Sequence, residues 1–324
     1  MLTIRVRHSD GTLALDVPFE EGVALLADPQ ALVWFDLEED SSDSAAEIAQ
    51  VGAALSLNHL TVEDLTHKGQ RGKFEQFPGY SVLVMHGFGY QRDEPRLDEY
   101  ELDLAIGANW VLTGRDPALV CLTPNAGLDA QLPTMMGSSA DFLLYAIADR
   151  LVDSMFPVLD EMLDDVDDIE GRVVADDTTG LLERIFAMKR NGVTLRKVVS
   201  PHLEIFTRLT SPAYAVVTPE HVIYFRDVHD HLIRVFEIVD SYRELMTGAL
   251  EVHLSTVNNR LSDVMKRLTV LTAMFLPLTF ITGAFGMNMV ESPVWTDPAF
   301  WIIAAGMLAI AAGQWVFFRF KGWA

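Results

Sequence analysis

Two long apolar runs near the C-terminal end constrain the fold of this chain more than any other feature. The first, residues 268–285, holds eighteen residues without a charge, and the second, residues 299–318, holds twenty, of which Gln314 is the most polar. A helix needs about 20 apolar residues to cross the hydrocarbon core of a bilayer. Neither run carries the polar face that a buried hairpin of a soluble protein would show. The sequence therefore predicts two transmembrane helices.

Basic residues beside these runs predict their orientation. Lys266 and Arg267 precede the first run, whereas Arg319 and Lys321 follow the second, and the loop between the runs holds two acidic residues and no basic ones. Cytoplasmic flanks of membrane helices carry an excess of Lys and Arg. We therefore expect a protein of the cell (inner) membrane with two spans, both termini in the cytoplasm and the loop outside.

The remainder of the chain is strongly acidic. The formal net charge is −22, although 50% of the residues are hydrophobic, and residues 1–262 carry essentially all of the negative charge. Such a field repels nucleic acid and concentrates cations. Alternatively, the charge only keeps a large domain soluble. The single cysteine, Cys121, excludes an intramolecular disulfide. The N-terminus lacks the apolar core of a signal peptide and reads as a strand and a turn.

The long N-terminal part predicts an α+β fold. Residues 31–40, 79–90 and 100–116 are rich in strand-forming residues, and residues 107–109 resemble a hairpin turn. Residues 43–57 and 60–67 have helical patterns. We therefore expect residues 1–137 to form a cytoplasmic α/β domain, with a mixed sheet and flanking helices. Residues 138–218 have apolar positions three or four apart and a strongly acidic opposite face, which predicts antiparallel helices.

A very long helix follows. Thr218 before Pro219 has the pattern of a helix N-cap, and apolar residues recur every three or four positions from there to the first span. We expect a stalk helix over residues 219–267, a first transmembrane helix over 268–288, an external loop over 289–298, a second transmembrane helix over 299–318 and a basic tail over 319–324. The narrow apolar seam of the stalk helix is typical of parallel helices that pack around an axis.

Several stretches resemble one family of membrane proteins. They are YFRDVHDH at residues 224–231, LPLTF at 276–280, GMN at 286–288, the segment LNHLTVEDLTHKGQRGKFEQF at 57–77, and the ending FKGWA. Together they resemble the CorA family of divalent-cation channels. The resemblance implies a funnel-shaped homopentamer in the lipid bilayer whose first span lines the pore. Mg²⁺ is the usual ion, Co²⁺ and Ni²⁺ also pass, and a ZntB-like branch of the family moves Zn²⁺.

The resemblance also implies a selectivity filter at the outer mouth. Gly286, Met287 and Asn288 match its Gly-Met-Asn motif, in which a ring of amide oxygens reads a hydrated ion. Alternatively, Asn288 only caps the end of a helix. Glu291 is a candidate for attracting cations to this mouth, or is simply a loop charge. The pore face carried over from the family is Ser262, Met265, Leu268, Thr272, Leu276, Thr279 and Gly283, with Leu268 and Leu276 as apolar constrictions.

A regulatory metal site between subunits is a further implication of the resemblance. Its acidic residues match Glu63, Asp64, Asp227 and Glu251, where bound intracellular Mg²⁺ would hold the pore closed. Alternatively, these are ordinary solvated acids. The histidines lack the spacing of a zinc site, because His229 and His231 are two apart on a helix and point to different sides.

Three functions stay open from the sequence, and none is an enzyme, because the sequence shows no nucleophile–base constellation or phosphate loop. The first is a passive Mg²⁺ channel that intracellular Mg²⁺ gates. The second is a Zn²⁺ transporter of the ZntB type, with proton coupling as an option. The third is a membrane-anchored metal sensor without transport, which the threonine hydroxyls along the first span argue against, because an inert anchor needs none.

Overall fold

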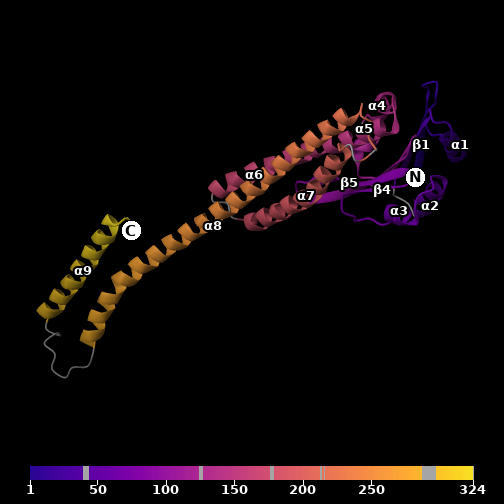
Figure 1. Cartoon of the computed structure of the whole chain (residues 1–324). Helices are drawn as coiled ribbons and strands as arrows, with labels where there is room; N and C mark the ends of the chain where they lie inside the picture. The colour runs from indigo at the N-terminus through magenta and orange to yellow at the C-terminus, as the bar shows by residue number, and fades with distance from the viewer. Residues whose placement is uncertain are drawn as a thin grey trace. The chain divides into compact units, whose positions relative to one another are not determined.

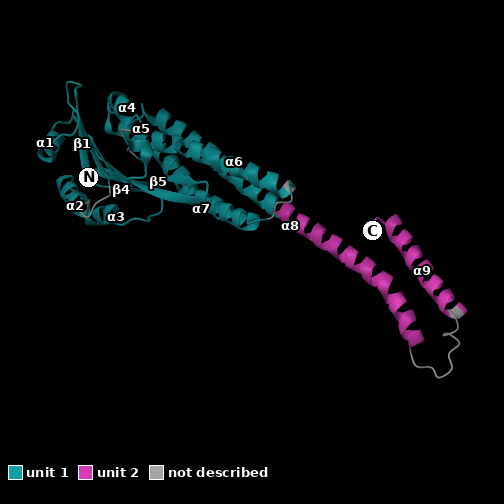
Figure 2. Cartoon of the chain, turned by 180° about the vertical axis from the view of Figure 1, so that it is seen from behind, with its two compact units in different colours: residues 1–250 teal, residues 251–324 magenta. Residues whose placement is uncertain are grey.

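The computed structural model describes residues 1–38, 44–123, 127–175, 179–211, 214, 216–286 and 297–323. The chain divides into two compact units, Met1–Leu250 and Glu251–Ala324, which Figure 2 colours teal and magenta. Helix α8 begins in the first unit and ends in the second.

A seven-stranded sheet forms the middle of the first unit. The strand order is β2-β1-β3-β7-β6-β5-β4, and neighbouring strands are antiparallel except for β3 and β7. The predicted turn at residues 107–109 connects β6 to β7, with the Gly107 amide donating to the Trp110 carbonyl at 3.0 Å. The mixed sheet confirms the predicted fold class. The strands are β1 Leu2–Arg7, β2 Leu13–Ala14, β3 Leu32–Glu38, β4 Lys73–Phe77, β5 Tyr80–Gln91, β6 Arg96–Ile106 and β7 Trp110–Arg115.

Helices cover both faces of this sheet (Figure 1). Side chains alternate between the faces of a strand, so Trp34 of β3 packs into one core and its neighbour Phe35 into the other. One group of helices covers the Phe35 face and a second group covers the Trp34 face. The first group is α1 Phe19–Ala24, α2 Ser44–Ala54 and α3 His59–Thr66, and the second is α4 Leu128–Met135, α5 Ala140–Asp153, α6 Met155–Val174, α7 Leu181–Leu209 and the first part of α8.

The apolar positions predicted for this helical layer are buried. Leu144, Ile147, Leu151 and Met162 all have no exposed surface, which confirms the helical periodicity. Asp165 of α6 is also fully buried, whereas Asp164 and Asp167 of the same helix are exposed. It accepts hydrogen bonds from the Tyr90 hydroxyl and from the guanidinium groups of Arg92 and Arg184 at 2.5, 2.9 and 2.7 Å. This ionic network joins α6 and α7 to the end of β5.

Helix α8 extends over Val222–Gly286 and therefore begins later than its sequence pattern predicted. The predicted N-cap role of Thr218 is wrong. Both the amide and the hydroxyl of Thr218 donate to the carboxylate of Asp141, each at 2.8 Å. A buried carboxylate is a strong acceptor, so Thr218 serves this long-range contact instead of the first turn of α8.

The second unit consists of the C-terminal part of α8 and of α9, Asp297–Phe320. The two helices lie side by side in both views (Figures 1 and 2). Each is long and apolar enough to cross a membrane. This agrees with the two spans predicted from the sequence.

Candidate functional site

The predicted pore-lining residues share one uncovered face of α8. All seven are exposed in the single chain; Leu268 has 55% and Leu276 has 66% of its surface accessible. Helix α9 contacts a different strip of α8, where Ala273, Pro277 and Ile281 are partly buried. The structure therefore leaves the predicted pore face free of contacts with α9.

Threonine hydroxyls on this part of α8 donate back into the helix. Thr272 donates to the Leu268 carbonyl at 2.9 Å and Thr279 to the Phe275 carbonyl at 2.8 Å. A hydroxyl that has used its hydrogen keeps an oxygen that can accept. The water molecules around a hydrated cation point their hydrogens outward, so such oxygens suit their passage.

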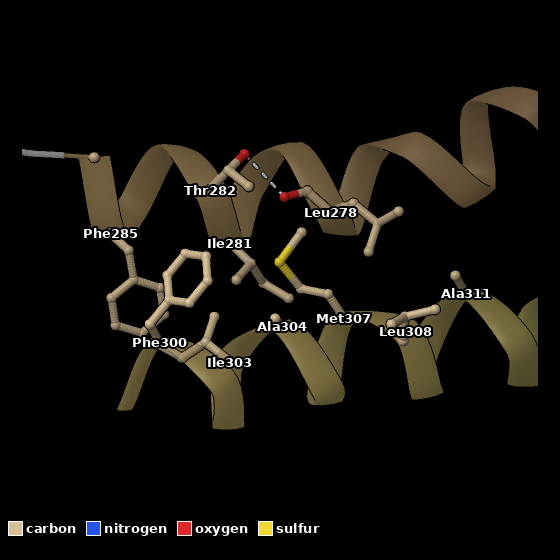
Figure 3. Close-up of a pocket in the computed structure, with 11 residues that line it drawn as sticks. Leu278, Ile281, Thr282, Phe285, Phe300, Ile303, Ala304, Met307, Leu308 and Ala311 are labelled. Atoms are coloured by element: carbon tan, nitrogen blue, oxygen red, sulfur yellow. Dashed lines mark hydrogen bonds between the residues drawn. The ribbon is translucent and has the colours of Figure 1, made fainter. Parts of the chain in front are cut away.

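A cavity of about 630 Å³ lies between α8 and α9. Figure 3 shows apolar side chains from both helices around it, including Ile281 and Phe285 of α8 and Met307 of α9. Among the described side chains that line it, only Thr282 is polar, and its hydroxyl already donates to the Leu278 carbonyl at 3.1 Å. An ion that prefers oxygen ligands would find little to hold it there, so this cavity is not a candidate path for cations.

Of the predicted filter, the structure describes only Gly286. Gly286 is the last residue of the helix and is exposed. Met287, Asn288 and Glu291 lie outside the described residues.

A group of possible metal ligands gathers around Asp227. One ligand atom each from Asp149 of α5 and from Asp227 and His231 of α8 lies within 4.8 Å of the others. Burial, together with the nearby carboxylates of Asp153 and Asp227, raises the pKa of Asp149 to about 6. Asp153 also approaches the Nδ1 atom of His231 at 3.4 Å. Carboxylates that crowd together in this way favour a bound divalent cation, which removes their repulsion.

The ligand atoms of this metal group do not favour a single ion. Carboxylate oxygens suit Mg²⁺, whereas an imidazole nitrogen suits Zn²⁺, Co²⁺ or Ni²⁺. Asp149 and His231 were missed by the sequence analysis, which compared His231 only with His229. Asp227 and His231 are four residues apart on one helix and therefore share a face. That spacing could have identified His231, but Asp149 comes from another helix and has no local signal.

The other predicted regulatory acids do not join this group. Asp64 pairs with Lys73 at 2.5 Å, and Glu63 is exposed one position before it on α3. Glu251 is exposed further along α8. Among the described residues of one chain, only Asp227 of the four predicted acids has other metal ligands beside it.

Two further histidines are buried, one on α7 and one on strand β5. His202 of α7 accepts a hydrogen bond from the His86 amide of β5 at 3.0 Å, and their rings stack. Burial lowers the pKa of His202 to about 3 and also lowers that of His86. Both are neutral at physiological pH. This pair therefore ties α7 to the sheet rather than forming part of the metal group.

Comparison with known proteins decides the family. The model of the CorA-like Mg²⁺ transporter family matches residues 29–319. The chain belongs to this family. It is 33% identical over 287 residues to the cobalt/magnesium transport protein CorA of Thermotoga maritima, which covers 85% of this chain and 79% of that protein. The resemblance stated from the sequence is thus confirmed.

Solved structures show the same fold. The CorA magnesium transporter from Methanocaldococcus jannaschii superposes with a TM-score of 0.84 over 100% of this chain and 99% of its own, at 19% identity. The ZntB cytoplasmic domain from Vibrio parahaemolyticus matches with a TM-score of 0.58 over 80% of this chain and 99% of its own, at 13% identity. CorA proteins are ion transporters and not enzymes, so this chain is a membrane transporter of divalent cations.

Proposed function

We propose that this CorA protein is a Mg²⁺ channel, which also admits Co²⁺ and Ni²⁺ and which intracellular Mg²⁺ closes. The observation that carries the proposal is the uncovered face of α8. It presents apolar residues at Leu268 and Leu276 and acceptor hydroxyls at Thr272 and Thr279, within a helix that is long enough to span the membrane. An inert membrane anchor would have no need of such a face.

The channel would be a homopentamer in the bilayer. Two spans cannot enclose a pore, so several copies must surround an axis. The exposed side chains of Leu261 and Val264 supply apolar surface on α8 for such contacts. The charges at either end of the spans support an orientation with both termini in the cytoplasm.

Selectivity would come from Gly286, Met287 and Asn288 at the outer end of the first span. Mg²⁺ is small and gives up its water reluctantly. A ring of Asn288 amide oxygens and Gly286 carbonyls can bind the hydrated ion without stripping it, and an uncharged ring releases it again. Glu291 would raise the local concentration of cations.

Gating would use the metal group around Asp227. A Mg²⁺ ion held by Asp227 and Asp149, with Glu63, Asp64 and Glu251 contributed across the subunit interface, would hold neighbouring domains together. When the ion leaves, the carboxylates repel one another and the subunits separate. The carboxylate pair of one chain is 4.8 Å or less apart at its ligand atoms, which supports this role.

A second candidate is Zn²⁺ transport of the ZntB type, with or without proton coupling. His231 favours it, because its imidazole adds a nitrogen ligand to the metal group. The fold likeness to the ZntB cytoplasmic domain is compatible with either ion.

Ion flux into proteoliposomes separates these functions. The purified full chain is reconstituted, and uptake of Mg²⁺ and of Zn²⁺ is followed with and without an imposed pH gradient. A Mg²⁺ channel gives Mg²⁺ uptake that follows the membrane potential and ignores the pH gradient. Zn²⁺ uptake that requires the pH gradient would favour the second candidate, and no uptake of either ion would favour a sensor.

A further inference from the structure

Pro277 removes one hydrogen bond from the membrane-spanning part of α8. In an α-helix the amide of residue 277 would donate to the carbonyl of Ala273, but proline has no N–H. Inside a bilayer no water is available to replace the lost donor, so an unpaired carbonyl is costly. Kinks in helices commonly occur at proline, and the magenta part of α8 is visibly bent (Figure 2).

Gln314 of α9 supplies the missing donor. Its side-chain Nε2 donates to the Ala273 carbonyl at 3.0 Å, between two helices of the same unit. The Gln314 Oε1 atom is buried and has no partner in the described part of the chain. Placing this amide between two spans therefore carries a desolvation cost, which the single bond to Ala273 has to offset.

The threonines of α8 provide a contrast. Thr272, Thr279 and Thr282 also donate to backbone carbonyls, at 2.9, 2.8 and 3.1 Å. Each of those carbonyls lies four residues before a residue that has its own backbone N–H, so the hydroxyl adds a second bond to a carbonyl that is already paired. Ala273 is different, because Gln314 replaces its missing helical partner.

We propose that Gln314 is a positioning residue of the permeation path, and that its bond to Ala273 holds the proline bend of α8 against α9. This inference rests on the proposed channel function, because α8 would line the pore. Leu276, one of the two apolar constrictions, lies between Ala273 and Pro277 in the sequence. The filter end of the helix lies beyond the bend. The bond between Gln314 and Ala273 therefore sets the position of Leu276 and of the filter end relative to α9. Helix α8 cannot straighten without breaking this bond.

A double-mutant cycle tests this inference on the full chain. Gln314→Met keeps the length of the side chain but removes the donor, and Pro277→Ala restores the helical donor to Ala273. Thr282→Val is the matched control, since it removes a donor from a carbonyl that stays paired. Two quantities are measured for each variant and for the double variant: the midpoint of thermal unfolding in detergent and Mg²⁺ uptake by proteoliposomes.

Gln314→Met is expected to lower the midpoint and to change the uptake rate by about three- to twentyfold, as expected for one interhelical hydrogen bond in a membrane. In the Pro277→Ala background, Gln314→Met should leave the midpoint of Pro277→Ala unchanged and should alter the uptake of that variant by less than about twofold. Thr282→Val should alter uptake by less than about twofold. Equal effects of Gln314→Met with and without Pro277→Ala, or no effect in either case, would overturn the inference.

Two further outcomes are also decisive. If Gln314→Met does not fold, recovery of a folded protein by Pro277→Ala supports the inference, and failure to recover it overturns it. The unfolding midpoints can show coupling between Gln314 and Pro277 while neither the native chain nor any variant takes up Mg²⁺. That result would contradict both the positioning role and the channel function. Normal uptake without coupling overturns only the role of Gln314.

Discussion

At the scale of single residues, the metal group brings together charges that are distant in the sequence. Asp149 lies on α5, whereas Asp227 and His231 lie on α8. Because burial and the neighbouring carboxylates raise the pKa of Asp149 to about 6, the Asp149 carboxyl group is mostly ionised at neutral pH. Its charge is then available to a cation but is easily lost on acidification.

Asp149→Asn tests whether this group binds the regulatory ion. Removal of one of two carboxylates is expected to weaken Mg²⁺ binding at least about tenfold, since loss even of a supporting contact around a metal commonly costs that much. Isothermal titration of the full chain in detergent measures the affinity. Asp160→Asn, which removes the same charge from the exposed side of α6, is the control. Equal affinities of both variants would exclude Asp149 as a ligand.

His202 predicts how stability depends on pH. Its pKa is about 3 in the folded chain and near 6.5 when unfolded, so the folded state binds fewer protons between these values. The free energy of unfolding should therefore be highest above pH 6.5 and fall by about 1 kcal/mol for each pH unit below it. His86, whose pKa is also lowered by burial, acts in the same direction.

Urea unfolding of the full chain between pH 5 and 7 measures this slope. In His202→Gln the amide oxygen can still accept from the His86 amide, but the side chain cannot titrate. The slope should be shallower than in the native chain. An unchanged slope would show that His202 does not cause the loss of stability.

At the scale of elements, one glycine sets the distance between two helices. A Cβ atom at Gly52 of α2 would lie 2.6 Å from a methyl carbon of Val62 on α3. Helix α3 carries Glu63 and Asp64, so this contact positions two of the proposed regulatory acids. Val62 is branched at its β-carbon and has little freedom to move away.

Gly52→Ala is therefore expected to destabilise the protein by about 1–3 kcal/mol through overpacking. In a Val62→Ala background the sign should reverse, because alanine favours a helix over glycine by up to about 1 kcal/mol. Chemical denaturation of the four proteins measures both effects. Destabilisation of similar size in the two backgrounds would mean that Val62 is not the obstacle.

Helix α8 also shows where prediction from the sequence succeeds and where it ends. Its apolar spacing predicted a helix that continues into the first span, and α8 does continue without a break as far as Gly286. The local sequence pattern could not reveal that Thr218 donates its amide and hydroxyl hydrogens to the carboxylate of Asp141, which is far away in the sequence. The same limit applies to the site: Asp227 was predicted from the family motif, whereas Asp149 required the packing of α5 on α8.

At the scale of the whole molecule, the proposed pore requires several copies of the chain. One chain leaves Leu268, Leu276 and Phe280 of α8 more than half exposed. Light scattering of the purified protein in detergent, corrected for bound detergent, should give five times the chain mass of 36.1 kDa. A monomer or dimer under these conditions would contradict a pore built from α8.

The most direct test of the central proposal is Mg²⁺ uptake by proteoliposomes that contain the native chain or Asn288→Ala. The native chain should take up Mg²⁺ along the membrane potential. Asn288→Ala should reduce the rate at least about tenfold, because it removes the amide ring that would read the hydrated ion. Ser292→Ala, four positions further along the sequence, should retain the native rate. Absence of Mg²⁺ uptake by the native chain, or an unchanged rate in Asn288→Ala, would contradict a Mg²⁺ channel with a Gly-Met-Asn filter.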